Sequence, residues 1–182
     1  MYQIRKAAPN DALGITIVNI YTWKTTYSGL MPDDAIDLRI AELKERAEKC
    51  KADIEQNNNF IVAEVDHTIV GFCVYGKARN DNFKESGEIF ALYALKGFQG
   101  MGIGKALFLA GVNELRIREN TSMIINCLQG NPALEFYKHM GGKIAGQRQD
   151  EIKGKKITED IIYYKDINSI CRADERFCPV AD

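Results

Sequence analysis

Three glycines at every second position form the segment best suited to bind a charged ligand. Gly100, Gly102 and Gly104 follow an apolar run, Ile89–Leu95, and precede a segment with helical spacing. Glycines let backbone N–H groups turn toward a ligand, and a helix start adds unpaired donors and a positive dipole end. The spacing predicts a phosphate-binding loop, and a tight strand-to-helix turn without a ligand is the alternative.

The same spacing excludes two common nucleotide-binding loops. The glycines do not form G-x-G-x-x-G, and no acidic residue closes a following strand about twenty residues on, as dinucleotide-binding folds require. Lys105 follows Gly104, but no glycine stands five residues before Gly104 and no Ser or Thr follows Lys105. The segment is therefore not a P-loop either.

A second group of polar and aromatic residues begins at Asn131 and ends at Gly141. A helix is expected from Pro132, and Asn131 can cap that helix or bind a ligand through its amide. Tyr137 lies on the apolar stripe of this helix. It is therefore either a core tyrosine or a proton donor at a site.

The sequence Gln99-Gly100-Met101-Gly102-Ile103-Gly104 resembles the acetyl-coenzyme A motif Q/R-x-x-G-x-G/A of the GNAT superfamily of N-acetyltransferases. The segment 131–141 is similar to the later asparagine, alanine and F-Y-x-x-x-G block of that family. The order of predicted elements from residue 2 to about 165 also agrees. Three departures are Lys96-Gly97 in place of a common proline, Gly142 in place of phenylalanine, and Asn131 standing two residues before the alanine instead of three.

This resemblance implies that acetyl-coenzyme A is the cosubstrate and that no metal takes part. Leu92 and Ala94 would contact the pantetheine and acetyl arm, with the Ala94 N–H on the thioester carbonyl. Asn131 would hold the end of the pantetheine. The pyrophosphate would lie on the loop residues Gln99, Gly100, Met101, Gly102, Ile103, Gly104 and Lys105.

The family chemistry also implies two proton transfers. Tyr137 would be the general acid that protonates the departing thiolate. Glu88, the single acid in an otherwise apolar strand, would be the base that takes a proton from the amine, and a solvated glutamate at a strand start is the alternative. The acceptor is expected against the first helices, where acids favour a cationic amine. The residues concerned are Trp23, Tyr27, Asp33, Asp34 and Asp37.

The elements that must position these residues alternate between strands and helices. Strands are predicted at 2–7, 60–65, 69–78, 89–95, 123–128, 143–152 and 156–165. Helices are predicted from 13, over 36–54 as one helix or two in line, over 102–119 and from 132. The expected fold is α/β (α+β), a mixed and mostly antiparallel central sheet of about seven strands with helices on both faces. One domain over 1–165 and a tail over 166–182 are expected.

Composition limits the partners and the compartment. The 182 residues are 46% hydrophobic, with 24 basic and 25 acidic side chains, so neither nucleic acid nor a membrane is an expected partner. The N-terminus lacks a signal-peptide pattern, which favours the cytoplasm. Five cysteines favour reduced thiols, although Cys171 and Cys178 could pair or bind metal.

The predicted function is transfer of acetyl from acetyl-coenzyme A to a primary amine of a small molecule or a peptide N-terminus. The alternative is a coenzyme A-binding or structural module with the same fold and no turnover. A homodimer is a further expectation, since the last hairpin can expose a strand edge.

Overall fold

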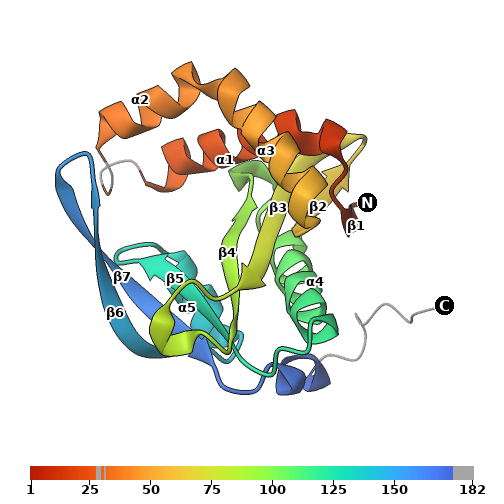
Figure 1. The fold of residues 1–182 in the computed structure, drawn as a ribbon. Helices are drawn as coiled ribbons and strands as arrows, with labels where there is room; N and C mark the ends of the chain where they lie inside the picture. The colour runs from red at the N-terminus through yellow and green to blue at the C-terminus, as the bar shows by residue number, and fades with distance from the viewer. Residues whose placement is uncertain (28–29, 31, 174–182) are drawn as a thin grey trace.

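The computed structural model describes residues 1–27, 30 and 32–173, and a mixed sheet runs through them (Figure 1). Its strand order is β1-β2-β3-β4-β5-β7-β6. All neighbouring strands are antiparallel except β4 and β5, which are parallel. The strands are β1 Gln3–Lys6, β2 Phe60–Val65, β3 Thr68–Lys77, β4 Gly87–Ala94, β5 Met123–Leu128, β6 Lys143–Ile152 and β7 Lys155–Tyr164.

Helices cover both faces of this sheet. The α-helices are α1 Ala12–Thr26, α2 Asp33–Ala41, α3 Leu43–Asn57, α4 Ile103–Ile117 and α5 Ala133–His139. Short 3-10 turns lie at Pro9–Asp11, Asp81–Phe83, Lys96–Phe98 and Ile167–Ala173. Helices α1 and α3 pack on one face, and α4 and α5 pack on the other. The predicted fold class and the predicted sheet are confirmed.

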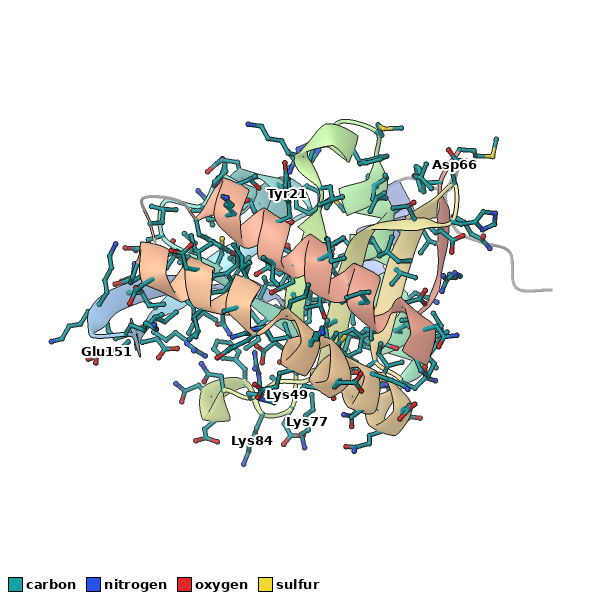
Figure 2. All side chains as sticks on the ribbon, turned by 90° about the horizontal axis from the view of Figure 1, so that it is seen from above. Tyr21, Lys49, Asp66, Lys77, Lys84 and Glu151 are labelled. Carbon is teal, nitrogen blue, oxygen red and sulfur yellow. The ribbon has the colours of Figure 1, made fainter. Side chains whose placement is uncertain are left out.

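Figure 2 shows the first face from above, with α1, α2 and α3 lying across the sheet. Glu151, near the β6–β7 turn, and Asp66, in the β2–β3 turn, mark opposite ends of the molecule in this view. The stretch predicted as one helix or two in line forms two helices, which meet at Glu42.

Local sequence explains the two tight hairpins. Asp66 and His67 join β2 to β3, and Lys153 and Gly154 join β6 to β7, all four with positive φ. Two-residue turns of this hand match the right-handed twist of the flanking strands. Each observed strand begins and ends within two residues of its predicted bounds.

The central strand β4 has different neighbours along its two sides. It pairs with β3 from Gly87 to Ala94, with one extra residue, Phe90, at a bulge. Bulges increase local twist and bend the strand that carries them. On its other side, β4 pairs with β5 only at Gly87 and Glu88. The two parallel strands therefore separate over the rest of their length.

Helix α4 lies close to the sheet because its inner face is apolar and contains a glycine. Leu107, Phe108, Val112 and Leu115 are fully buried in this layer. A Cβ at Gly111 would lie 2.8 Å from the Cys73 sulfur, well inside ordinary contact distance. The glycine therefore sets how closely α4 approaches β3.

The beginning of the predicted tail packs against the domain. Ile167 is fully buried, and its N–H donates to the Thr121 carbonyl at 2.9 Å. The Arg116 guanidinium donates to the Ile167 carbonyl. Cys178 and the side chain of Cys171 lie outside the described residues.

Two further findings concern the cysteines and the apolar character of the helices. Cys50, Cys73 and Cys127, the three cysteines whose side chains are described, are free thiols. Within the described ranges, no helix combines the length and apolar character needed to cross a bilayer.

Candidate active site

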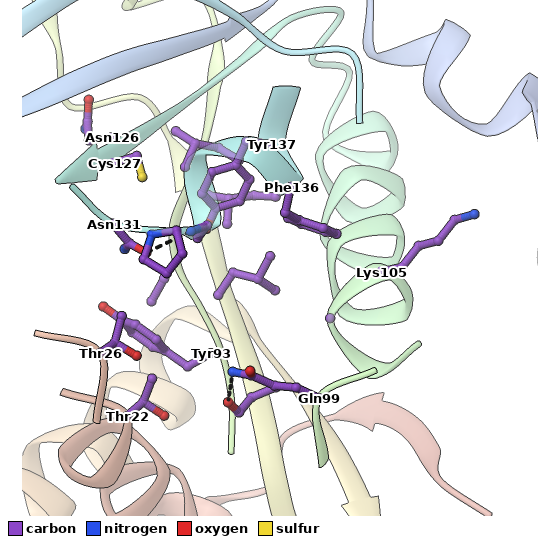
Figure 3. Close-up of a pocket in the computed structure, with 18 of the residues that line it drawn as sticks. Thr22, Thr26, Tyr93, Gln99, Lys105, Asn126, Cys127, Asn131, Phe136 and Tyr137 are labelled. Carbon is purple, nitrogen blue, oxygen red and sulfur yellow. Dashed lines mark hydrogen bonds between the residues drawn. The ribbon is translucent and has the colours of Figure 1, made fainter. Parts of the chain in front are cut away.

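A cavity of about 470 Å³ lies between the separating strands β4 and β5. Its wall is made by α1, β4, the glycine loop, β5 and the start of α5, as Figure 3 shows. The predicted site residues that line it are Leu92, Ala94, Gln99, Gly100, Gly102, Gly104, Lys105, Asn131 and Tyr137. The structure thus brings together residues from two sequence segments that are about thirty positions apart.

The glycine loop adopts a backbone that favours glycine. Gly100 has φ +79° and Gly102 has φ +82°, and Gly102 caps the N-terminus of α4. Both values fall in the left-handed region, where a side chain is strained. The first N–H groups of α4 have no carbonyl within the helix, so this end offers donors and a positive dipole to an anion. Figure 3 shows the Lys105 side chain extending from α4 away from Tyr137.

The backbone of Ala94 points into the cavity. The Leu95 N–H donates to the Val70 carbonyl on β3 at 2.9 Å. Because hydrogen-bonding direction alternates along an antiparallel pair, the N–H and C=O of Ala94 point to the opposite edge, where β5 has moved away. The Ala94 carbonyl accepts a hydrogen bond from the Gln99 side chain at 3.4 Å, drawn in Figure 3. The Ala94 N–H is therefore directed toward the cavity.

Two loop residues named from the sequence do not place their side chains in the cavity. Met101 is 54% exposed, and Ile103, the first residue of α4, is buried in the core. Neither lines the cavity. Their neighbours in the loop do line it, so Met101 and Ile103 can contribute to a ligand only through the backbone.

Tyr137 lies at the cavity wall with its ring almost entirely buried, at 7% exposure. Burial raises the pKa of its hydroxyl well above the usual value near 10. Its carbonyl accepts a hydrogen bond from the Tyr164 hydroxyl at 2.8 Å. Because of this raised pKa, the hydroxyl keeps its proton. No residue that the structure describes hydrogen-bonds the Tyr137 hydroxyl itself, so it is available to a ligand.

Asn131 both caps α5 and faces the cavity. Its Oδ1 accepts from the Ala133 N–H at 2.9 Å, which confirms the capping interpretation. Its Nδ2 donates to the Tyr27 hydroxyl at 3.3 Å, and that hydroxyl lies 3.4 Å from the Tyr93 hydroxyl. These side chains come from the residue that ends α1, from β4 and from the segment after β5, and together they form a polar wall.

Two residues that line the cavity, Tyr93 and Thr22, were not identified from the sequence. Tyr93 sits in a strand that reads as uniformly apolar, but strand side chains alternate, so it faces α1 while Leu92 and Ala94 face α4. Thr22 lies in α1, and its Oγ1 is buried with no hydrogen-bond partner among the described residues. The alternation in β4 was the available signal for Tyr93, and none marked Thr22.

Glu88 is buried but does not line the cavity. Its carboxylate accepts hydrogen bonds from the Arg79 backbone N–H at 2.9 Å, the Arg79 guanidinium at 2.8 Å and the Asn126 amide at 3.1 Å. Asn126 does line the cavity, and its Oδ1 has no partner among the described residues. Asn126 thus separates Glu88 from the cavity, and a proton would reach Glu88 from there by way of water.

Two of the acids expected near the acceptor, Asp34 and Asp37, do not line the cavity. Asp34 and Asp37 are exposed, and Asp34 pairs with Lys153 at 3.3 Å. The side chain of Asp33 lies outside the described residues. Trp23 packs edge-on against Tyr27, with ring centres 5.0 Å apart. Among the described residues, no three His, Cys, Asp or Glu side chains gather closely enough to hold a metal ion.

Comparison with known proteins adds independent findings. A family model described as acetyltransferase (GNAT) family matches residues 19–141. The uncharacterized N-acetyltransferase YuaI of Bacillus subtilis is 26% identical over 170 residues, which cover 93% of this chain and 96% of the relative.

Solved structures share the fold. The PaiA N-acetyltransferase of Thermoplasma acidophilum in complex with coenzyme A superposes with a TM-score of 0.69 at 21% identity, over 90% of this chain and 98% of that one. The yncA protein of Salmonella typhimurium, solved with its cofactor acetyl-CoA, has a TM-score of 0.67 at 18% identity, over 100% of this chain and 99% of that one.

Proposed function

The chain belongs to the acetyltransferase (GNAT) family, and we propose that it transfers the acetyl group of acetyl-coenzyme A to a primary amine. The amine, on a small molecule or a peptide N-terminus, attacks directly within a ternary complex. The observation that carries this proposal is the cavity between β4 and β5, which extends from the glycine loop to Tyr137.

The cosubstrate fits the chemistry of the cavity walls. The N-terminus of α4 and the loop at Gly100–Gly104 supply donors for a pyrophosphate. The unpaired edges of β4 and β5 offer peptide groups to the amides of a pantetheine arm. Acetyl-coenzyme A supplies an acetyl group already activated as a thioester.

Two groups of this chain would then act on the reacting atoms. The Ala94 N–H would donate to the thioester oxygen, and this bond would strengthen as negative charge develops on that oxygen. The Tyr137 hydroxyl would give its proton to the sulfur as the carbon–sulfur bond breaks. Its raised pKa means that the hydroxyl carries its proton throughout the neutral range, and it would release that proton only as negative charge develops on the sulfur.

The acceptor would approach from the α1 side of the sheet. Tyr93 projects to that side from β4, whereas Leu92 and Ala94 project to the α4 side with the glycine loop. Asn126 is also at the cavity, with its amide group held by Glu88. Glu88 would take the amine proton through an intervening water, with Asn126 holding its carboxylate in place.

The test is a panel of primary amines incubated with acetyl-coenzyme A, with free thiol as the readout and calorimetric binding of coenzyme A in parallel. We expect thiol release that depends on both protein and amine. Tight binding of coenzyme A with no thiol release from any amine would instead assign the chain to a non-catalytic coenzyme A-binding module.

A further inference from the structure

Arg39 of α2 is a half-buried cation that contacts two neutral side chains among the described residues. Its guanidinium carbon lies 3.4 Å from the centre of the Trp23 ring, so the two groups are in close contact. Its Nη1 donates to Asn19 Oδ1 at 3.2 Å. No carboxylate forms an ion pair with it in the described part of the chain. Most of its N–H donors are therefore left for another acceptor.

In the described part of the chain, the one carboxylate that acts on Arg39 is shared with a second arginine. Burial, reinforced by the nearby Arg46, lowers the pKa of Arg39 to about 10. Glu42 acts on it in the opposite direction, but that carboxylate is already bonded to Arg46 at 2.8 Å. A partly desolvated guanidinium without a counter-ion is unfavourable, and an anion that binds there would remove this cost.

Arg39 does not itself line the cavity, but contacts through Trp23 connect it to the acceptor side. Trp23 contacts Arg39 and also packs against Tyr27. Tyr27 and Tyr93 both line the cavity, and both are close enough to act on Arg39 electrostatically. Figure 3 shows Tyr93 and Thr22 at the α1 end, across the cavity from α4. The unpartnered, buried hydroxyl of Thr22 is a second polar group there that lacks a ligand.

We propose that the acceptor amine also carries an anionic oxygen group, a carboxylate or a phosphoryl group, which binds Arg39 while the amine reaches the thioester. This inference rests on the proposed acetyl transfer and narrows its substrate class. A guanidinium binds such oxygens through two parallel hydrogen bonds, and contact with Trp23 restricts its orientation. The acceptor is thus amino acid-like, in place of the cationic amine expected from the aspartates of α2.

The first experiment compares acceptors that differ only in charge. Amino acids of increasing chain length are assayed beside their amides and beside aminoalkylphosphonates of the same length. We expect kcat/KM for the best acid to exceed that for its amide by about tenfold or more, the size of one charge-assisted pair. A higher kcat/KM for the phosphonate than for the carboxylate would identify the anion as a phosphoryl group.

Variants of Arg39 then link the preference to this residue. Arg39→Gln should remove the difference between acid and amide, mainly by lowering kcat/KM for the acid, and Arg39→Lys should retain part of it. The matched control is Arg118→Gln, which removes an arginine that also lies over an aromatic ring, but over Tyr75, which among the described residues has no contact with the acceptor side of the cavity. This control should keep the full preference. Equal rates for acids and amides, or a preference that survives in Arg39→Gln, would overturn the inference.

A binding readout separates this inference from the proposed function. With saturating coenzyme A, the acid should raise the melting temperature of the unaltered protein more than its amide does, and Arg39→Gln should lose that difference. If no amine releases thiol but this shift is present, acetyl transfer fails and the anion site stands. If thiol is released but acid and amide shift the melting temperature equally, the anion site fails.

Discussion

At the scale of single residues, the chemistry depends on whether each buried polar group already has a hydrogen-bond partner. The Tyr137 hydroxyl is enclosed, has no hydrogen-bond partner among the described residues, and keeps its proton because its pKa is raised. Glu88 is equally enclosed but accepts hydrogen bonds from Arg79 and Asn126. One group is therefore available to a ligand, whereas the other is already engaged.

Tyr137→Phe tests the general acid. The ring and most of the buried area remain, so the free energy of unfolding should change by less than about 0.5 kcal/mol. kcat and kcat/KM should fall together by ~10²-fold or more, with coenzyme A affinity unchanged. The control is Tyr164→Phe, which removes the hydrogen bond to the Tyr137 carbonyl and should cost stability of about 1 kcal/mol but little activity. Full kcat in Tyr137→Phe would make Tyr137 a core residue.

Glu88→Gln tests the base. We expect kcat/KM to fall by ~10²-fold, because an amide cannot take the amine proton. Arg79→Gln is the control, since it breaks the same 2.8 Å ion pair but leaves the carboxylate in place. Equal losses of kcat/KM in the two variants would show that Glu88 only supports the structure.

At the scale of elements, the loop and the helix that follows it form one ligand-binding unit. Gly100 and Gly102 have positive φ, so any side chain there would strain the backbone as well as alter binding. Gly104 and Gly97 lack this complication, because a Cβ at either position meets no atom within 4 Å. Gly104 lines the cavity and Gly97 does not.

Gly104→Glu therefore tests phosphate binding without backbone strain. The added carboxylate would stand where the pyrophosphate is expected, so the affinity for coenzyme A should fall by ~10²-fold with the fold retained. Gly97→Glu adds the same charge outside the cavity and should bind coenzyme A almost normally. Calorimetry measures both affinities. Similar affinities in the two variants would contradict the assignment of the loop.

Gly111→Ala tests how α4 is held against the sheet. The new methyl group would lie 2.8 Å from the Cys73 sulfur, so overpacking should cost about 1–3 kcal/mol despite a better helix propensity. Cys73→Ala in the same chain makes room for that methyl. Urea unfolding should show the double variant to be more stable than the sum of the single changes predicts. Strict additivity would mean that the two side chains do not meet.

At the scale of the whole molecule, buried thiols and phenols link stability to alkaline pH. Burial raises the pKa of Cys127 to about 12 and that of Cys73 further still. Burial also raises the pKa values of Tyr27 and Tyr164. In the unfolded chain these thiols lose their protons near pH 9 and the phenols near pH 10. Above pH 9 the unfolded state therefore binds fewer protons than the folded state.

The free energy of unfolding should accordingly fall as the pH rises above 9. The expected slope is roughly 1.4 kcal/mol per pH unit for each thiol that ionises only in the unfolded chain. Urea unfolding under reducing conditions at pH 7.5, 9 and 10 measures it, and Cys127→Ala should reduce the slope. A constant free energy across this range would mean that these thiols ionise equally in both states.

Local sequence patterns were sufficient to predict the strands and helices, their order, the glycine loop and the segment that carries Tyr137. These depend on local patterns: apolar spacing along a helix or strand, turn residues, and glycines where φ is positive. That is why the strands at 60–65, 123–128 and 143–152 were predicted with their observed bounds.

The way these parts meet could not be predicted from local patterns, because it depends on long-range packing. The separation of β4 from β5 depends on strand pairing. The contact between Tyr27 and Asn131 joins residues 104 positions apart. The engagement of Glu88 by Arg79 and the packing of Arg39 on Trp23 likewise join side chains from different elements. Local pattern specifies which face a residue presents, but the partner that it finds there depends on the packing of the whole chain.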